Sequence, residues 1–226
     1  MSDTVKISNP AISVVIVDDH PIVRKGIVQL IAQEPGFRVV GEAAGADEAL
    51  GIIRSQVPDV AVVDLTLTGM SGIELIKAVR SEGLKVALLV VSMHDERVYA
   101  ERCLRQGANG YVMKEEAAET IIGAIRTVVA GGTHLSTRLM SATVNRLVGG
   151  RNEVGGKGAM VAALSDRELE VFQLIGRGFT TRSIAEELQL SVKTVEAHKA
   201  NIKAKLALRS APELQRLAVT WIQSQG

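Results

Sequence analysis

The chain has 226 residues, of which 46% are hydrophobic and only 3% aromatic, so it can hold one or two globular domains packed mainly by aliphatic side chains. Residues 1–130 carry 13 Lys and Arg against 17 Asp and Glu, a charge of −4, whereas residues 131–226 carry 13 against 8, a charge of +5, which makes the second part the candidate partner of nucleic acid. The single cysteine, Cys103, excludes an intrachain disulfide and a cysteine-based zinc site, and with no signal-peptide pattern and no apolar run long enough for a membrane span we expect a cytoplasmic protein with no membrane partner.

Five apolar runs rich in β-branched residues alternate with amphipathic segments over the first 130 residues. The predicted strands are 12–17, 38–43, 59–64, 85–91 and 109–113. The predicted helices are 21–34, 47–56, 71–82, 95–107 and 116–130. Near-continuous apolar runs indicate strands buried on both faces, so the five units predict a parallel sheet with right-handed crossovers. No glycine-rich dinucleotide fingerprint follows the first run, which favours a flavodoxin-like α/β domain over residues 12–130.

The pattern changes after residue 130. Residues 131–148 contain a turn and one short helical segment, and the stretch 149–158 has five glycines in ten residues without apolar periodicity. That composition is typical of a flexible linker, which we assign to residues 131–159. Only helical periodicity remains from Leu164 onward, so the sequence predicts a small all-α domain of four helices over residues 160–226.

Polar side chains follow four of the predicted strands. Asp18 and Asp19 come after the first strand, Asp64 ends the third, Ser92 follows the fourth and Lys114 follows the fifth. Ligands of open parallel sheets bind beyond the carboxyl ends of the strands, so these side chains are expected at one rim. Three carboxylates at one site repel one another unless a cation lies between them, and oxygen ligands suit Mg²⁺.

The same rim contains the groups needed to bind and transfer a phosphoryl group. A metal ion, the Lys114 ammonium and the Ser92 hydroxyl can hold it, and a carboxylate can accept it as an acyl phosphate. Simpler interpretations remain open for each residue taken singly. Asp19 could cap the next helix, Asp64 could cap a loop, and Lys114 could pair with an adjacent glutamate at the surface.

Four stretches resemble the receiver domain of bacterial response regulators in two-component signalling: VVIVDDHPIVRKGI, DVAVVDLTLTGMSGIEL, LLVVSMHDE and GANGYVMK. The resemblance implies that Asp64 is the phosphoacceptor. It also implies Mg²⁺ ligation by Asp19, Asp64 and the Thr66 carbonyl, with Asp18 acting through water. The switch and phosphate-binding residues that it implies are Ser92, Tyr111 and Lys114.

The sequence departs from the pattern of that family in two places. Leu67 and Thr68 stand where Met-Pro is common, which is expected to loosen the loop after Asp64 without removing a charged group. Glu115 stands where many relatives have proline after the lysine, so a cis-proline lock is not expected there.

The basic part contains a helix-turn-helix pattern. A short helix is predicted from near Thr180, the break QLS follows, and Ser191 is a good N-cap for a helix beginning at Val192. Buried positions of that second helix share one face, while small residues and lysines share the opposite face, as a helix entering a major groove requires. The candidate DNA contacts are Thr181, Arg182, Lys193, Thr194, Glu196, Ala197, Lys199, Ala200, Asn201 and Lys203.

The lysines are expected mostly at phosphates and Asn201 at a base edge, while Glu196 opposes the charge of DNA. A basic surface helix in an ordinary bundle is the alternative, since helix pairs with tight turns are common. His198 is expected to be a packing or phosphate-contacting residue and not a metal ligand.

Residues 160–225 resemble the LuxR-type helix-turn-helix, on the stretches LSDRELEV, IAEELQLSVKTVEAH and IKAKL. The last predicted helix, 212–223, has an apolar stripe that either closes the core of its own domain or pairs two subunits. The candidate dimer contacts are Leu214, Leu217 and Trp221.

The whole chain thus resembles a NarL/FixJ-type response regulator. The resemblance implies a transcription regulator that a sensor histidine kinase phosphorylates on Asp64 and that binds double-stranded DNA as a homodimer. No enzymatic activity is expected beyond Mg²⁺-dependent self-phosphorylation from a donor and slow self-dephosphorylation. Two alternatives stay open: a phosphohydrolase with an aspartyl phosphate, although Thr66 stands where a second Asp is usual, and a DNA-binding regulator that does not use phosphate.

Overall fold

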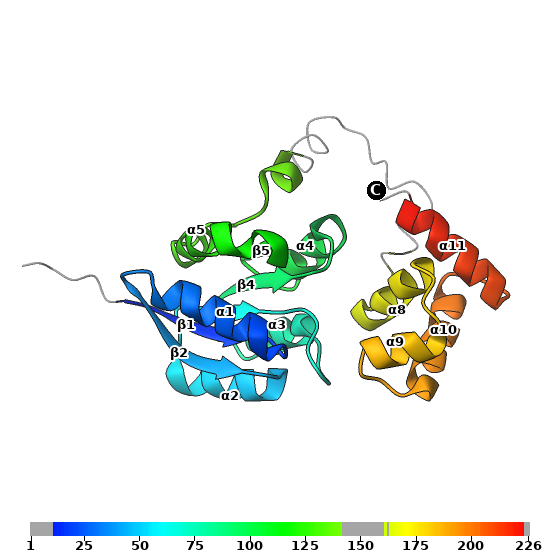
Figure 1. The fold of residues 1–226 in the computed structure, drawn as a ribbon, viewed down its shortest axis with the longest axis horizontal. Helices are drawn as coiled ribbons and strands as arrows, with labels where there is room; N and C mark the ends of the chain where they lie inside the picture. The colour runs from blue at the N-terminus through cyan, green and yellow to red at the C-terminus, as the bar shows by residue number, and fades with distance from the viewer. Residues whose placement is uncertain (1–10, 142–160, 162, 224–226) are drawn as a thin grey trace, which may run out of the picture. The chain divides into compact units, whose positions relative to one another are not determined.

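The computed structural model describes residues 11–141, 161 and 163–223. The chain divides into two compact units, residues 1–144 and 145–226. The first unit is an α/β domain and the second is helical (Figure 1).

The first unit is built on a five-stranded parallel sheet with the order β2-β1-β3-β4-β5. The strands are β1 (Ile12–Val17), β2 (Phe37–Ala43), β3 (Val60–Val63), β4 (Ala87–Ser92) and β5 (Gly110–Met113). The helices are α1 (Pro21–Ala32), α2 (Ala46–Gln56), α3 (Gly72–Ser81), α4 (Glu96–Arg105) and α5 (Ala117–Val129), with a 3₁₀ turn, η1 (Lys114–Glu116), before the last. The flavodoxin-like fold predicted from the sequence is therefore confirmed.

One hydrophobic core joins α1 and α5 to the central strands. Val14 and Ile16 of β1 pack there with Ile27 and Ile31 of α1 and Ile121 of α5, all at most 5% exposed. The alternate residues of the same strands are also buried, so β1, β3 and β4 are covered on both faces as expected. The expectation is wrong for β2, because it is an edge strand with most of its residues only partly buried.

The opposite edge strand, β5, is covered by the chain that follows α5. The Tyr111 N–H donates to the His134 carbonyl at 2.9 Å, and the His134 N–H donates to the Asn109 carbonyl at 3.1 Å. Gly110 allows this approach, because a Cβ atom there would lie 2.9 Å from the His134 carbonyl oxygen. Residues 137–141 are helical, at the start of the predicted short helix, while the glycine-rich stretch 149–158 lies outside the described residues.

The described part of the second unit forms four helices: α8 (Asp166–Gly176), α9 (Thr181–Glu187), α10 (Val192–Lys205) and α11 (Ala211–Gln223). Ser165 and Glu168 close a capping box that starts α8. The predicted N-cap Ser191 accepts a hydrogen bond from a first-turn backbone N–H, and so does Thr180, near which the preceding helix was expected to start. The four-helix prediction is confirmed, with bounds within one or two residues of those expected for α9 to α11.

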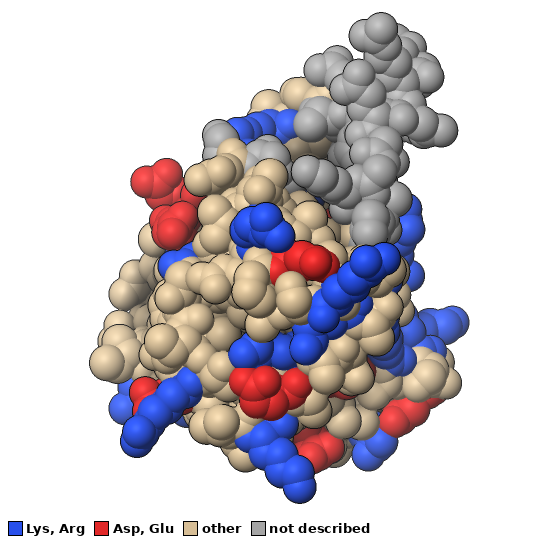
Figure 2. Space-filling view, turned by 90° about the vertical axis from the view of Figure 1, so that its right-hand side faces the viewer, with Lys and Arg blue, Asp and Glu red and all other residues tan. Residues whose placement is uncertain are grey.

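Helix α8 is the centre of this unit, with α10 and α11 packed against it. The Phe172 and Trp221 rings meet edge-on at 5.8 Å. Gly176 allows α11 to approach, since a Cβ atom there would lie 2.6 Å from the Ala218 carbonyl oxygen. On the face of the molecule drawn in Figure 2, Lys and Arg side chains form several groups with fewer Asp and Glu among them. No described helix is both long and apolar enough to span a membrane.

Candidate functional site

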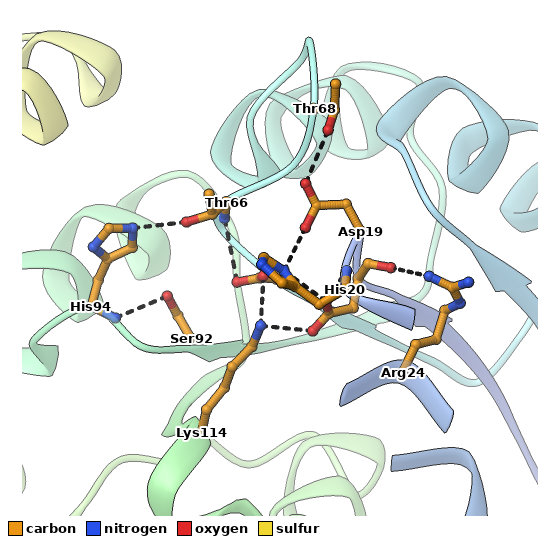
Figure 3. Close-up of polar contacts among 10 residues, drawn as sticks. Asp19, His20, Arg24, Thr66, Thr68, Ser92, His94 and Lys114 are labelled. Carbon is orange, nitrogen blue, oxygen red and sulfur yellow. Dashed lines mark hydrogen bonds and ion pairs between the residues drawn. The ribbon is translucent and has the colours of Figure 1, made fainter. Parts of the chain in front are cut away.

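The carboxylates predicted to meet at one rim of the sheet do so. Asp18 and Asp19 follow β1 and Asp64 follows β3, and single ligand atoms of these residues and His20 lie within 4.8 Å of one another. The Lys114 Nζ atom lies 2.7 Å from Asp64 Oδ2 and 2.7 Å from Asp18 Oδ2 (Figure 3). Lys114 therefore pairs with the buried acids. The simpler interpretation, in which Lys114 pairs with an adjacent glutamate at the surface, is wrong.

The interpretation of Asp19 as a helix cap is also wrong. His20 occupies the N-cap position of α1, where no side chain caps the helix, and Pro21 is the first helical residue. The Asp18 carboxylate instead accepts the His20 N–H at 2.8 Å, and Arg24 donates to the Asp18 carbonyl. These contacts fix the loop after β1, in which the Asp19 carboxylate reaches the Thr68 hydroxyl (Figure 3) and the Asp18 carboxylate reaches Lys114.

Burial and charge act against each other at Asp64, whose residue is 3% exposed. Burial raises the pKa of Asp64 to about 6, although the charge and the hydrogen bond of Lys114 oppose this rise and the nearby Asp18 adds to it. For Lys114, burial lowers the pKa, but the attraction of Asp64 and Asp18 is stronger and the net pKa is raised. The Thr66 backbone N–H donates to Asp64 Oδ1 at 3.3 Å, which ties the Asp64 carboxylate to the loop that follows it.

The site fits a divalent cation on its own chemistry. Asp18 Oδ2 and Asp19 Oδ1 are buried and accept no hydrogen bond from the described residues, although Lys114 Nζ and the His20 ring lie nearby. Lys114 contacts both Asp18 and Asp64, so one ammonium faces three carboxylates, and buried anionic oxygens are costly unless further positive charge compensates them. Three carboxylates from two strand ends form the oxygen-rich donor set of a hard divalent ion.

The loop after Asp64 makes contacts that its sequence does not predict. The Thr68 hydroxyl donates to Asp19 Oδ2 at 3.0 Å, and Leu67 is 1% exposed, so both residues that stand in place of Met-Pro are engaged. Gly72, the first residue of α3, lies so close that a Cβ atom would be 2.1 Å from the Asp64 carbonyl oxygen. A capping box of Ser71 and Glu74 fixes this helix start against the loop.

The candidate switch residues lie on β4 and β5. Ser92 is fully buried, its Oγ accepts the His94 N–H at 3.2 Å, and the Tyr111 hydroxyl donates to the His94 carbonyl at 2.7 Å. Burial raises the pKa of the Tyr111 hydroxyl well above its ordinary value, so it remains a donor.

His94 connects this group to the phosphoacceptor loop and was not among the residues predicted from the sequence. Its Nε2 atom lies 2.9 Å from Thr66 Oγ1 (Figure 3). The centroid of its ring lies 4.7 Å from that of Tyr99, with the two rings tilted. His20 was also missed as a member of the carboxylate cluster. Both lie within three residues of the end of a strand, β1 for His20 and β4 for His94, and that position was the available signal.

In the second unit, α10 has the two faces expected of a recognition helix. Val195 and Ile202 are fully buried, whereas Lys193, Glu196 and Ala197 are exposed. The other candidate contacts of α10 are exposed or partly buried, namely Thr194, Lys199, Ala200, Asn201 and Lys203. Thr181 and Arg182 begin α9. His198 is partly buried, and burial lowers its pKa.

The apolar stripe of α11 serves the core of its own unit. Leu214 is 1% exposed and Trp221 is 8% exposed, and α11 packs against α8. Of the two alternatives, this burial supports the one in which α11 closes the core of its own domain. Leu217 is partly buried.

Comparison with known proteins assigns a family to each unit. Residues 14–126 match the response regulator receiver domain, and residues 162–218 match the bacterial regulatory proteins of the luxR family. The oxygen regulatory protein NreC of Staphylococcus aureus (strain bovine RF122 / ET3-1) is 37% identical over 208 residues, which cover 91% of this chain and 96% of that protein.

Two solved structures extend the comparison. A two-component response regulator of the LuxR family from Aurantimonas sp. SI85-9A1 has 36% identity and a TM-score of 0.57 over 61% of this chain and 99% of its own. The RcsB response regulator of Salmonella typhimurium, described for its conformational dynamism in DNA interaction, has 26% identity and a TM-score of 0.61 over 94% of this chain and 98% of its own. The paired acids at the sheet rim and the exposed basic helix thus occur together in a chain that belongs to the NarL/FixJ-type response regulators, in which a receiver domain precedes a LuxR-type DNA-binding domain.

Proposed function

We propose that Asp64 is the phosphoacceptor of this response regulator and that its phosphorylation, supported by Mg²⁺, controls DNA binding through α10. One observation carries the proposal: Lys114 Nζ lies 2.7 Å from Asp64 Oδ2, at the rim where two further carboxylates meet. An ammonium in that position neutralises the oxygens of an incoming phosphoryl group while leaving Asp64 Oδ1 toward the loop.

Asp18, Asp19, Asp64 and the Thr66 carbonyl would hold the metal ion, with Asp18 acting through water. The ion supplies positive charge to the phosphoryl oxygens during transfer. An Asp64 carboxylate oxygen attacks phosphorus, a P–O bond to Asp64 forms, and the bond between phosphorus and the donor breaks with its electron pair leaving on the donor. Lys114 exchanges its contact with Asp64 for one with the new phosphoryl group, and the Ser92 hydroxyl donates to it.

The route from this event to the second unit runs through β5. Tyr111 and His94 repack when Ser92 turns toward phosphate. The Tyr111 backbone N–H donates to the carbonyl of His134, five residues beyond the end of α5. This contact supports a two-state change in which a shift of β5 moves the start of the linker at His134. The domains that it joins are residues 12–130 and 160–226, with residues 131–159 as linker.

A receiver domain implies a sensor histidine kinase as phosphoryl donor, and α10 is the helix proposed to enter the major groove of double-stranded DNA, as one half of a homodimer. The proposed contacts are those predicted on α9 and α10. Only self-phosphorylation from a donor and slow self-dephosphorylation are proposed as chemistry. Thr66 offers no acidic group for turnover of an external phosphoester, and its hydroxyl is engaged by His94.

The test is labelling of the full-length chain by acetyl phosphate. We expect Mg²⁺-dependent labelling of the wild type and none of Asp64→Asn, which keeps the size of the side chain but removes the nucleophile. Asp59→Asn is the matched control, because Asp59 precedes β3 at the far end of the same strand, where it accepts from Ser13. Persistent labelling of Asp64→Asn would place the phosphoacceptor elsewhere, and equal DNA affinity with and without the donor would remove the phosphate control.

A further inference from the structure

A polar network links α9 to α10 on the exposed side of the second unit. The Lys199 ammonium donates to Glu196 Oε1 at 2.8 Å and to Thr181 Oγ1 at 2.9 Å. The Thr181 hydroxyl donates to the same Glu196 oxygen at 2.9 Å. Two donors from two different helices thus converge on one carboxylate oxygen.

This network orients the Glu196 carboxylate through its Oε1 atom and leaves the Oε2 atom without a hydrogen bond from the described residues. Among the described residues, every hydrogen bond and ion pair of Glu196 involves Oε1, so Oε2 remains available as an acceptor. The side chain is 55% exposed, while the Lys199 side chain is 21% exposed. A fixed side chain gives up less conformational freedom on binding than a mobile one, which favours its use in recognition.

Glu196 also has the position of a base-reading residue. It is the fifth residue of α10 and is exposed, at the flank of the face that points away from the fully buried Val195 and Ile202. The N-terminal residues of a recognition helix are those that reach base edges in the major groove. Its neighbour Ala197 is exposed and small, so the helix backbone can approach the groove closely at this point.

The charge state of Glu196 restricts what it can recognise. Hydrogen bonds from Lys199 and Thr181 lower the pKa of Glu196, so it is ionised at neutral pH and accepts hydrogen bonds without donating any. In the major groove cytosine presents an N4 amino donor, whereas guanine presents the N7 and O6 acceptors, which repel a carboxylate. Lys199 balances the negative charge of Glu196, which reduces its repulsion from the phosphates.

We propose that Glu196 is a specificity-determining residue, whose free carboxylate oxygen accepts a hydrogen bond from the N4 amino group of one cytosine in the DNA site. This inference rests on the proposed role of α10 as the helix that enters the major groove. Lys199 and Thr181 are positioning residues in it, because they orient the carboxylate through its other oxygen.

The test is a selection of binding sites from random DNA duplexes by the full-length protein. The wild type is expected to prefer cytosine at one position by about tenfold, within the range of a good base contact. Glu196→Ala is expected to bind all four bases there equally. Glu196→Gln is expected to change the preference toward adenine, because an amide pairs with the N6 and N7 atoms of adenine.

Glu187→Gln is the matched control, since it removes one negative charge from an exposed glutamate of α9 outside the network. It is expected to retain the wild-type preference at every position. Thermal unfolding of each variant checks that the exposed substitutions leave the fold intact.

Two results would overturn the inference, and they differ. If Glu196→Ala binds every duplex more tightly by one common factor, with unchanged base preferences, Glu196 acts only through its charge while α10 still binds DNA. If the wild type enriches no sequence and Lys193→Ala binds as tightly as the wild type, α10 is not the DNA-reading helix, and the proposed function of this unit fails together with the inference.

Discussion

Lys114 and Asp64 form a buried ion pair across the rim of the sheet, with Nζ and Oδ2 separated by 2.7 Å and both side chains less than 10% exposed. The same ammonium contacts Asp18 at 2.7 Å, so one positive charge faces two buried negative ones. The remaining negative charge favours the binding of a second cation at this rim. Without that cation, Lys114 is the group that offsets the cost of burying the carboxylates.

The first prediction concerns the removal of this ammonium. Lys114→Met should destabilise the receiver domain by about 3–5 kcal/mol at neutral pH, because it leaves buried carboxylates without their partner. Mg²⁺ should recover more stability in the variant than in the wild type. Urea denaturation with and without Mg²⁺ measures both effects. The double variant Lys114→Met with Asp64→Asn should be more stable than Lys114→Met alone, and a lower stability would contradict the assignment of the cost to the unpaired acid.

The second prediction concerns pH in the absence of metal. Folding raises the pKa of Asp64 from 3.8 to about 6, so the folded state binds more protons than the unfolded state between these values. Asp64 therefore lowers the free energy of unfolding as the pH rises from about 4 to about 6, by about 3 kcal/mol, and contributes no further change above that.

Urea denaturation in EDTA across this pH range, for the wild type and Asp64→Asn, isolates the contribution. As the pH rises over this interval, the free energy of unfolding of the wild type should fall relative to that of Asp64→Asn. A difference independent of pH would show that Asp64 is not protonated near pH 5. Binding of Mg²⁺, which competes with that proton, should strengthen as the pH rises toward 6 and level off above it.

The sequence predicted which residues meet at the rim but not how they interact. Strand direction was sufficient for Asp18, Asp64 and Lys114, because the carboxyl ends of parallel strands share one edge. The contact of His94 with Thr66 depends instead on the path of two loops, which local patterns do not determine. The hydrogen bond of Thr68 was not predicted for the same reason, since its partner Asp19 lies 49 residues away.

A similar limit applies to the helical unit. Helix starts were predictable because the N-caps Thr180 and Ser191 act locally. The apolar stripe of α11 predicted that one face of this helix is buried, but not whether α8 or a second subunit covers it. In the structure α11 packs on α8, and Leu214 and Trp221 are buried within their own unit. The pairing of Glu196 with Thr181 needs the packing of α9 on α10, which no spacing along the chain reveals.

The third prediction concerns Gly72. A Cβ atom at this position would lie 2.1 Å from the Asp64 carbonyl oxygen and 2.8 Å from the Leu65 Cα, and backbone atoms cannot move aside as a flexible side chain can. Gly72→Ala should therefore destabilise the receiver domain by about 1–3 kcal/mol and slow its labelling by acetyl phosphate, because the phosphoacceptor loop must shift.

Gly26→Ala provides the control for this change. Gly26 lies within α1 with no atom within 4 Å of the added Cβ, so the same substitution should stabilise the domain by about 0.5–1 kcal/mol and leave labelling unchanged. Equal effects of the two substitutions would contradict the role given to close packing at Gly72.

The last prediction concerns phosphate contacts by α10. Lys193 is exposed and Lys205 is paired with Glu168 of α8 at 2.6 Å, although both belong to the same helix. If Lys193 neutralises a phosphate, Lys193→Ala should weaken binding to all duplexes alike and reduce the slope of log affinity against log salt by about 0.9. Lys205→Ala should leave that slope unchanged and lower the stability of the helical unit, because it removes the partner of a carboxylate whose side chain is 5% exposed. Fluorescence anisotropy at several salt concentrations measures the slopes, and a Lys193→Ala slope equal to that of the wild type would exclude Lys193 from the phosphate contacts.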